Sequence, residues 1–404
     1  MPIEAKAAER GPPIPLWRWA GRQLRELATI TGSPKIAAVD GMAILGERGS
    51  LRDFEIRGRQ STGVGGSRLN PTRDGSWFAL TMARPGDRGY LPALFGKEGM
   101  EDAGDEAIAA EVLLHDSKEL LAKGRALGLA VACSDEIPPG PAVEVLTRGK
   151  YRQRSMGHRP LVVDLSAIWA GPLAGHLLWL AGADVIKIEN AGRPDLFRGS
   201  DPRTFAAINQ GKDSADLELT DPIQRDHLIE MIRKADIVIE ASRPRALRHL
   251  GIDADALVRE VPGLVWLTVT GHGATGEAAN WIGVGNDCAV AGGVSRALAE
   301  AAGEIGYVGD ALADPLTGIT VALEGWRAYQ TGEATRIGFA MSAIVARALA
   351  EEKEHDAVAL QAELRAWGAA VGKLFPKLPP REVTGPVRDL GADTEKWFGP
   401  AKAS

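Results

Sequence analysis

The sequence predicts an α/β protein, in which a Rossmann-like parallel sheet carries helices on both faces and a smaller α+β domain is attached. Beyond residue 156, short apolar runs alternate with helix-like segments, and this alternation is typical of a parallel sheet covered on both faces. Before residue 156 the pattern is mixed, with short apolar runs, a glycine-rich turn and a few helix-like segments. At 404 residues the chain is long enough for about two to three such units.

The first 35 residues are expected to form an arm or a packing helix. A proline-rich stretch at 10–15 precedes a helix-like run at 16–24, where Leu and Trp are interspersed with Arg and Gln. This composition does not indicate a function.

Residues 36–155 predict the small α+β domain. Its expected elements are a glycine-rich turn, a strand after an Asp-Gly turn signal, and two helices, at 61–67, 77–82, 105–114 and 117–123. A Pro-Pro-Gly-Pro run at 138–141 and a basic run at 148–155 then predict a surface linker. The domain boundary is placed at this linker.

Residues 156–349 predict the large domain through their regular alternation. The strand-like runs are 161–165, 185–188, 237–240 and 264–269. The helix-like runs between them are 171–181, 223–235 and 253–261. A further helix is expected from Asp314 to 329, followed by an apolar segment at 337–349. Residues 350–404 are expected to start as a helix and to end in proline-rich coil.

Composition excludes several functional classes. An apolar fraction of 45% and a charged fraction of 25% are those of a globular protein, and a net charge of −6 argues against nucleic-acid binding. No stretch reaches the roughly 18 apolar residues that a membrane span needs, and the start lacks a signal-peptide pattern, so we expect a soluble, unprocessed protein. Cys133 and Cys288 are far apart, which predicts neither a disulfide nor a metal site and suits a reducing cytoplasm.

Asp314 is the acidic residue with the strongest claim to chemistry. It precedes Pro315 at the expected start of a helix. Asp followed by Pro is also a common helix cap, because the side chain accepts an amide hydrogen bond and Pro suits the first helical position. Spacing alone leaves both roles open.

Seven segments in unbroken order, spread over about residues 160–345, resemble the family III CoA transferases, the group that also contains carnitine and bile-acid CoA transferases. They are 163–172 (VDLSAIWAGP), 182–189 (GADVIKIE), 209–212 (NQGK), 235–244 (ADIVIEASRP), 249–251 (HLG), 271–273 (GHG) and 314–318 (DPLTG). No single segment is specific, but the ordered set is.

The resemblance implies that Asp314 is the nucleophile of a CoA transferase. Its carboxylate would attack an acyl-CoA thioester and then carry CoA as an aspartyl thioester before a carboxylic acid takes it over. The partners implied are therefore an acyl-CoA and a carboxylic acid, with no permanently bound cofactor. Amide dipoles at the helix start are expected to keep Asp314 ionised at pH 7, with its reactive oxygen free of the cap bond.

The glycine-rich turn allows two interpretations. Gly63, Gly65 and Gly66 would, by resemblance, form a lid whose backbone N–H groups face the oxyanion of the reaction. A tight turn between strands is the alternative.

CoA carries phosphates and an adenine, so its site needs cationic groups and amides. Charged candidates at the expected carboxyl ends of strands, where open α/β sheets bind ligands, are Arg193, Arg198, Lys212, Arg243 and His249. The resemblance favours Asn190, Leu217, Arg243, Ala246 and His249. Asn190 and His249 stand where the family often has Arg. For each charged residue, a solvated surface position remains the alternative.

The order of segments departs from the family pattern. Small-domain features precede the catalytic segment here, whereas the family places them after it, so the chain looks rearranged. The run 386–394 still resembles the closing Gly-x-x-Thr of the family. The resemblance implies a homodimer, which in the family is interlocked.

Two alternative functions stay open. The first is an acyl-CoA racemase or isomerase, but Asn286 occupies the position of the racemase His, and His272 is expected to be a lone turn or packing residue. The second is a CoA-binding protein whose catalytic groups have decayed. Other acidic residues, Glu189, Asp236 and Glu240, could be paired acids, but they are more simply expected to be solvated or capped at strand edges and helix ends.

Overall fold

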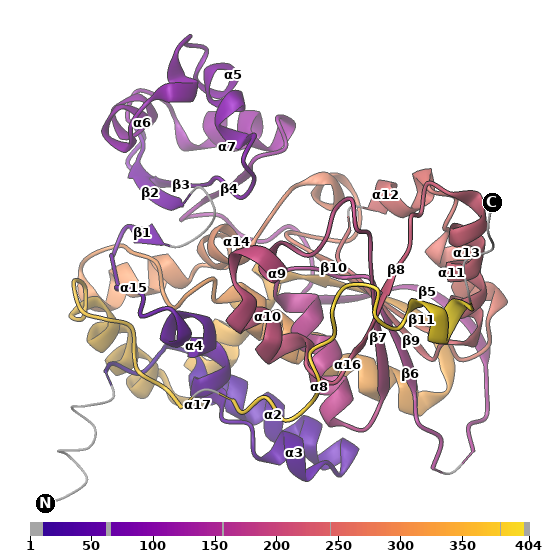
Figure 1. The fold of residues 1–404 in the computed structure, drawn as a ribbon. Helices are drawn as coiled ribbons and strands as arrows, with labels where there is room; N and C mark the ends of the chain where they lie inside the picture. The colour runs from indigo at the N-terminus through magenta and orange to yellow at the C-terminus, as the bar shows by residue number, and fades with distance from the viewer. Residues whose placement is uncertain (1–10, 62–65, 156, 243, 380, 400–404) are drawn as a thin grey trace, which may run out of the picture.

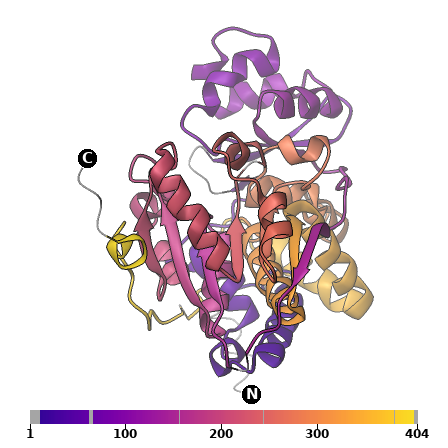
Figure 2. The same cartoon turned by 90° about the vertical axis from the view of Figure 1, so that its right-hand side faces the viewer.

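The computed structural model describes residues 11–399, apart from 62–65, 156, 243 and 380. It confirms the predicted fold class, because a large, mostly parallel sheet lies between helices and a separate small antiparallel sheet stands apart from it in both views (Figures 1 and 2). The large sheet has the order β5-β11-β10-β9-β6-β7-β8. Its strands are β5 Val143–Tyr151, β6 Leu161–Asp164, β7 Asp184–Glu189, β8 Asp213–Asp216, β9 Ile237–Glu240, β10 Val265–Thr270 and β11 Glu333–Ala340.

The central strands are apolar on both sides because helices cover both faces of the sheet. In β9, Ile237 and Ile239 enter one hydrophobic core, while Val238, between them, enters the other. The first core contains α2 Trp17–Thr31, α4 Gly41–Leu51, α8 Ala170–Leu180, α16 Ala313–Thr331 and α17 Met341–Gly368. The second contains α11 Pro222–Lys234 and α13 Ala254–Glu260. Side chains that alternate along a strand explain the near-continuous apolar runs in the sequence.

The small sheet has the order β1-β2-β3-β4 and is antiparallel throughout. Its strands are β1 Gln60–Ser61, β2 Ser67–Pro71, β3 Trp77–Thr81 and β4 Ala130–Cys133. The helices α5 Leu91–Phe95, α6 Asp105–Val112 and α7 Ser117–Ala126 cover one face around a core of their own. The other face meets α14 Gly285–Ala291, with Ala79 and Ala132 packed near Val290.

The remaining helices connect these units. They are α3 Pro34–Ala37, α9 Leu196–Ser200, α10 Pro202–Asn209, α12 Pro244–His249, α15 Val294–Ala302 and α18 Thr394–Phe398, with short 3-10 turns at Asp87–Tyr90, Met100–Asp102 and Glu277–Asn280. No helix within the described part of the chain combines the length and the apolar character that a bilayer crossing requires.

The predicted surface linker at 148–155 is wrong for its first residues. Residues Val143–Tyr151 form β5, which pairs antiparallel with β11 at the edge of the large sheet. Only Thr147 of this strand is buried, so its sequence lacks the apolar run that marks the central strands. The apolar segment 337–349 likewise divides into the end of β11 and the start of α17.

The N-terminal helices belong to the core of the large sheet. Trp19 and Leu24 of α2 and Ile44 of α4 are fully buried in the same core as Leu316 and Ile319 of α16. The packing of α2 agrees with the sequence, which predicted a packing helix in this region. Helix α4 reaches the site described below.

Candidate functional site

Asp314 lies in the first turn of α16, but its side chain does not cap that helix. The N-cap position is Leu312, which makes no side-chain cap hydrogen bond, and the Asp314 N–H donates to the carbonyl of Ala311 over 2.9 Å. The Asp314 carboxylate faces another helix, where the backbone N–H of Ala170 donates to it at the start of α8. The structure therefore favours a role other than capping.

Two glycines allow this close approach. A Cβ on Gly318 would come within 2.8 Å of the Ala170 carbonyl oxygen, so glycine lets α16 lie against the first turn of α8. A Cβ on Gly285 would overlap Asp314 Oδ2 and lie 2.5 Å from the Ala311 carbonyl oxygen. Both positions need glycine because each backbone lies directly against a neighbouring segment, Gly318 against Ala170 and Gly285 against Ala311 and Asp314.

The pKa of Asp314 is raised to about 7, chiefly because burial disfavours its ionised form, with Asp310 and Asp287 adding negative charge. Arg48 and the Ala170 N–H act in the opposite direction. The expectation of a fully ionised carboxylate at pH 7 is therefore wrong, since desolvation outweighs the helix dipole. Although the residue is partly exposed, its carboxyl group is enclosed well enough to titrate near neutrality.

Arg48 and Asp310 form a buried ion pair beside Asp314. Arg48 Nε lies 2.8 Å from Asp310 Oδ2, and the guanidinium carbon lies 4.9 Å from the centre of the Trp169 ring. This pair could not be predicted from local patterns, because the two residues are 262 positions apart and Arg48 was assigned to the small domain. Burial of an arginine is rare without such a partner.

A cavity of about 680 Å³ opens beside this pair. Its walls combine aromatic and charged side chains and include Arg48, Phe54, Phe197, Tyr307, Asp310, Trp367 and Phe375. Gly66 and Ser61 line it from the side of the small sheet. Asp310, four residues before Asp314, lines this cavity, whereas Asp314 is not among its lining residues. The volume is in the range of small-molecule pockets.

Of the predicted glycine lid, only Gly66 lies within the described residues; Gly63 and Gly65 lie outside them. Gly66 has φ +78°, and a Cβ there would lie 2.5 Å from Arg68 Nη1, so the position suits glycine. It directly precedes β2. The lid stays a prediction.

Asn190 and Leu217 lie together at the carboxyl ends of β7 and β8, as expected for neighbouring parallel strands. Asn190 Nδ2 donates to Glu218 Oε2 over 2.8 Å and to the Leu217 carbonyl over 3.3 Å. Its Oδ1 accepts the Gly192 N–H over 2.7 Å. The side chain thus closes a turn, while Leu217 is buried.

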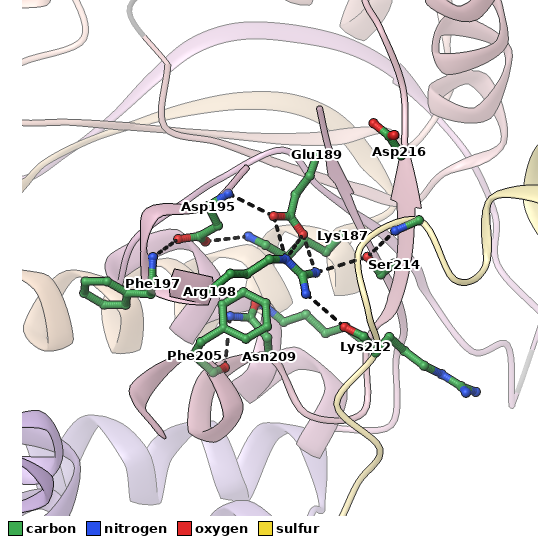
Figure 3. Close-up of polar contacts among 12 residues, drawn as sticks. Lys187, Glu189, Asp195, Phe197, Arg198, Phe205, Asn209, Lys212, Ser214 and Asp216 are labelled. Carbon is green, nitrogen blue, oxygen red and sulfur yellow. Dashed lines mark hydrogen bonds and ion pairs between the residues drawn. The ribbon is translucent and has the colours of Figure 1, made fainter. Parts of the chain in front are cut away.

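Arg198, on α9, and Lys212 belong to an internal network of charges (Figure 3). Lys212 immediately precedes β8, so its expected position at the carboxyl end of a strand is wrong. Arg198 Nη2 lies 2.5 Å from Glu189 Oε2, and its Nη1 donates to the Arg388 carbonyl over 3.0 Å. Lys212 is 2% exposed and donates to Asp164 Oδ2 over 2.8 Å. Both cations are already neutralised by carboxylates, and their assignment to CoA stays a prediction.

The same network fixes the loop that leads into α8. Lys187 Nζ lies 3.0 Å from Asp195 Oδ2 and donates to the Ser166 carbonyl over 2.7 Å. Both Asp195 oxygens accept the Ile168 N–H at 3.2 Å. The Ala170 amide that faces Asp314 therefore sits at the end of a loop tied down by buried charges.

The other predicted CoA ligands lie on the surface or outside the described residues. Ala246 and His249 are exposed on α12, after β9, and Arg193 is exposed after β7. Arg243 lies outside the described residues.

His272 is not the lone residue expected from the sequence. It is fully buried, neither ring nitrogen has a hydrogen-bond partner among the residues that the structure describes, and its Nε2 lies 3.7 Å from Asp287 Oδ2. Cys288 completes a group whose ligand atoms lie within 4.8 Å of one another. Burial raises the pKa of the Cys288 thiol well above its usual range, and the nearby Asp287 charge adds to this. The cluster arises from the fold, because residues 272 and 287 belong to different elements.

The expectation that Glu189, Asp236 and Glu240 are solvated or cap helices is wrong for their exposure, since all three are at most 9% exposed. Asp236 accepts hydrogen bonds from His158 Nε2 and the Leu161 N–H, each over 2.9 Å. Asp236 also pairs with Arg152 and Arg154, and Glu240 lies near Arg336, all distant in the sequence, so local patterns could not reveal the burial of these two residues.

Comparison with known proteins supplies the family. The model described as CoA-transferase family III matches residues 160–377. The acetyl-CoA:oxalate CoA-transferase of Acetobacter aceti is 35% identical over 127 residues, which are 30% of this chain and 33% of the relative. The succinate–glutarate CoA-transferase of Agrobacterium fabrum is 28% identical over 239 residues, which are 55% of this chain and 58% of the relative.

A crystal structure of the hypothetical protein Rv3272 from Mycobacterium tuberculosis is similar with a TM-score of 0.45 and 26% identity, over 51% of this chain and 59% of that one. The chain thus spans from a third to under two thirds of the length of these relatives.

Proposed function

Since the chain belongs to CoA-transferase family III, we propose that it moves CoA from an acyl-CoA donor to a carboxylic acid acceptor, with Asp314 as the carrier. One observation carries this proposal. Asp314 is a carboxylate in the Asp-x-x-Thr-Gly segment that resembles the family's catalytic segment, and its pKa of about 7 keeps much of it ionised at neutral pH. A pKa near the working pH is typical of groups that take part in chemistry.

The proposed reaction has balanced half-steps. An Asp314 oxygen attacks the thioester carbonyl, a C–O bond forms, and the C–S bond breaks to release CoA thiolate. The thiolate then attacks the Asp314 carbonyl carbon of the mixed anhydride, which forms aspartyl-CoA and releases the donor acid as a carboxylate. An acceptor carboxylate repeats both steps in reverse. One thioester replaces another, so no ATP is needed and no net proton is consumed.

The surroundings of Asp314 support these steps. The Ala170 N–H is a donor for an oxyanion that develops on the Asp314 carboxyl carbon. Arg48 is a positive charge near the same group. Both act in a partly enclosed site, where the interaction of a charge or dipole with the reacting group is stronger than in water.

We propose that CoA lies along the carboxyl ends of the strands, near Asn190, Leu217, Ala246 and His249. Arg243, and the lid formed by Gly65 and Gly66, belong to the same proposal. Arg198 and Lys212 would contribute by holding the loops at this edge, given their internal ion pairs. The two cysteines, both free and buried, suit a reducing cytoplasm, and by analogy with the family we propose a homodimer.

Mass spectrometry of the protein after incubation with a panel of acyl-CoAs tests the proposal. We expect a CoA or acyl adduct on the peptide that contains Asp314, and its loss after hydroxylamine treatment. Asp314→Ala should carry no adduct and show no CoA exchange between an acyl-CoA and a free acid. Exchange by Asp314→Ala at the parent rate would reject the nucleophile.

A second function, proton exchange at the α-carbon of an acyl-CoA, is favoured by one observation. His272 and Asp287 form a buried pair 3.7 Å apart near Asp314, and a His beside a carboxylate is a common general base. Deuterium incorporation at the α-carbon without an acceptor acid would identify this activity. CoA exchange without deuterium incorporation would support the transferase and count against proton exchange.

A further inference from the structure

Helix α4 brings a buried cation to the site from a part of the chain that precedes the family-matched residues 160–377. Arg48 lies in the last turn of α4, and its side chain is 10% exposed. Its guanidinium forms a two-pronged ion pair with Asp310, with Nε to Oδ2 at 2.8 Å and Nη2 to Oδ1 at 2.5 Å. Two parallel bonds of this kind fix the plane of the guanidinium.

The same guanidinium is enclosed by aromatic rings. Its carbon lies 4.9 Å from the centre of the Trp169 ring and 5.8 Å from the centres of the Phe54 and Phe197 rings. Trp169 is 1% exposed and immediately precedes Ala170. Arg48 therefore contacts both segments of the site, one through Trp169 and the other through Asp310.

Both segments contain a non-glycine residue with a left-handed backbone. Ile168 has φ 72°, and Ala311 has φ 46°. Such conformations are unfavourable for residues other than glycine and persist only where the surroundings hold them. Asp195 accepts the Ile168 N–H over 3.2 Å, and Asn286 Oδ1 accepts the Ala311 N–H over 3.1 Å. Each segment is thus anchored separately, and Arg48 joins the two.

We propose that Arg48 is a positioning residue for CoA transfer, because it joins the segment that carries the Asp314 carboxylate to the segment that carries the amide facing it. The inference rests on the proposed function of Asp314. It assigns to an N-terminal helix, outside the family-matched residues, a part in building the site.

Arg48 also adds charge to the site. Burial raises the pKa of Asp314, and Arg48 is the main charge that opposes this rise, while Asp310 before α16 and Asp287 on α14 favour it. Cys288, next to Asp287, is protonated at neutral pH because its pKa is well above the usual range. Arg48 thus has two roles, joining the two segments and lowering the pKa of Asp314, and substitutions can separate them.

Two variants separate these roles. Arg48→Lys keeps the charge but loses the two-pronged bond, so we expect kcat to fall by roughly tenfold to a hundredfold, with the acid limb of the pH profile near its parent midpoint. Arg48→Met combined with Asp310→Asn removes both charges without leaving a buried carboxylate unpaired. Its acid limb should move to higher pH, because the charge of Arg48 outweighs that of Asp310 at Asp314.

Arg73→Lys is the matched control. Arg73 forms the same two-pronged pair with Asp116 on the exposed surface, at 3.0 Å and 2.7 Å, and its loss should leave kcat and the pH profile unchanged. If Arg48→Lys had the same kcat and the same pH midpoint as the parent protein, the inference would be overturned. Activity in Asp314→Ala would instead overturn the proposed function, so the two failures are distinguishable.

Chemical rescue provides a measurement that does not depend on comparing stabilities. Arg48 lines the cavity of about 680 Å³, so small cations can reach the space that its side chain vacates. Folded Arg48→Ala should regain activity with methylguanidinium, which restores the planar fork, but not with methylammonium. Absence of rescue in the folded variant would count against a positioning role.

Discussion

Two carboxylates that accept amide hydrogen bonds from the two ends of one loop, Asp164 from Ser166 and Asp314 from Ala170, have pKa values shifted in opposite directions. Asp164 ends β6 and is fully buried; burial alone would raise its pKa, but Lys212 and Lys187 more than offset this and lower it. At Asp314 the main opposing charge is Arg48, which is already paired with Asp310, so burial prevails and the pKa of Asp314 rises. Burial alone therefore does not raise the pKa of a carboxyl group; the pKa rises where nearby cations compensate the burial incompletely.

The largest expected effect is on stability, when the cation that balances the charge of Asp164 is removed. Lys212→Met leaves a buried carboxylate without its closest cation, and we expect the free energy of unfolding to fall by about 3–5 kcal/mol. Chemical denaturation at pH 7 measures this change. The control Lys396→Met breaks an exposed pair with Asp213 and should cost about 1 kcal/mol or less. Similar losses in the two variants would mean that the buried network has no special role.

A smaller effect is expected when the packing around Asp314 is changed. Gly285→Ala places a methyl group against Asp314 Oδ2 and the Ala311 carbonyl, and the shift should lower kcat by roughly a hundredfold. Steady-state kinetics with an acyl-CoA and an acceptor acid measures it. Gly104→Ala is the control, since a Cβ there would meet no atom within 4 Å. A parent kcat in Gly285→Ala would show that the carboxylate position is not critical.

The smallest effect is a difference in pH dependence. A folded-state pKa of about 7, against an ordinary 3.8, means that the folded protein holds a proton which the unfolded chain has released. Asp314 therefore destabilises the fold progressively as pH rises from about 4 to about 7. Asp314→Asn lacks this titration, so its melting temperature should rise relative to the parent over that window and stay parallel above it.

The same pH series with Asp164→Asn should give the opposite slope. The pKa of Asp164 is lowered in the fold, so its stabilisation is present above the ordinary carboxyl pKa and is lost as pH falls below it. The parent should therefore lose its advantage over Asp164→Asn on acidification. Equal slopes for the two variants would contradict the contrast between these carboxylates.

The sequence predicted the parts of the fold that depend on local pattern. Apolar runs such as 161–165 and 237–240 marked strands because both of their faces are buried. The edge strand Val143–Tyr151 was missed because only Thr147 in it is buried and because it carries charged residues. The segment 337–349 was ambiguous because strand and helix are both apolar there.

For the site, spacing and resemblance singled out Asp314, whereas its partners depend on tertiary structure. Arg48 is 262 residues from Asp310, and His272 meets Asp287 only after the chain folds. The raised pKa of Asp314 was equally hidden, since a helix start alone favours ionisation and the desolvation depends on packing between α8 and α16.

The burial of α2 against α16 has a consequence for biosynthesis. Trp19 shares a core with Ile319, a residue translated 300 positions later. At roughly 5–20 residues per second, the ribosome needs about 15–60 s to supply that partner. During this interval the apolar face of α2 lacks that partner, and exposed apolar surface makes an unfinished chain prone to aggregation.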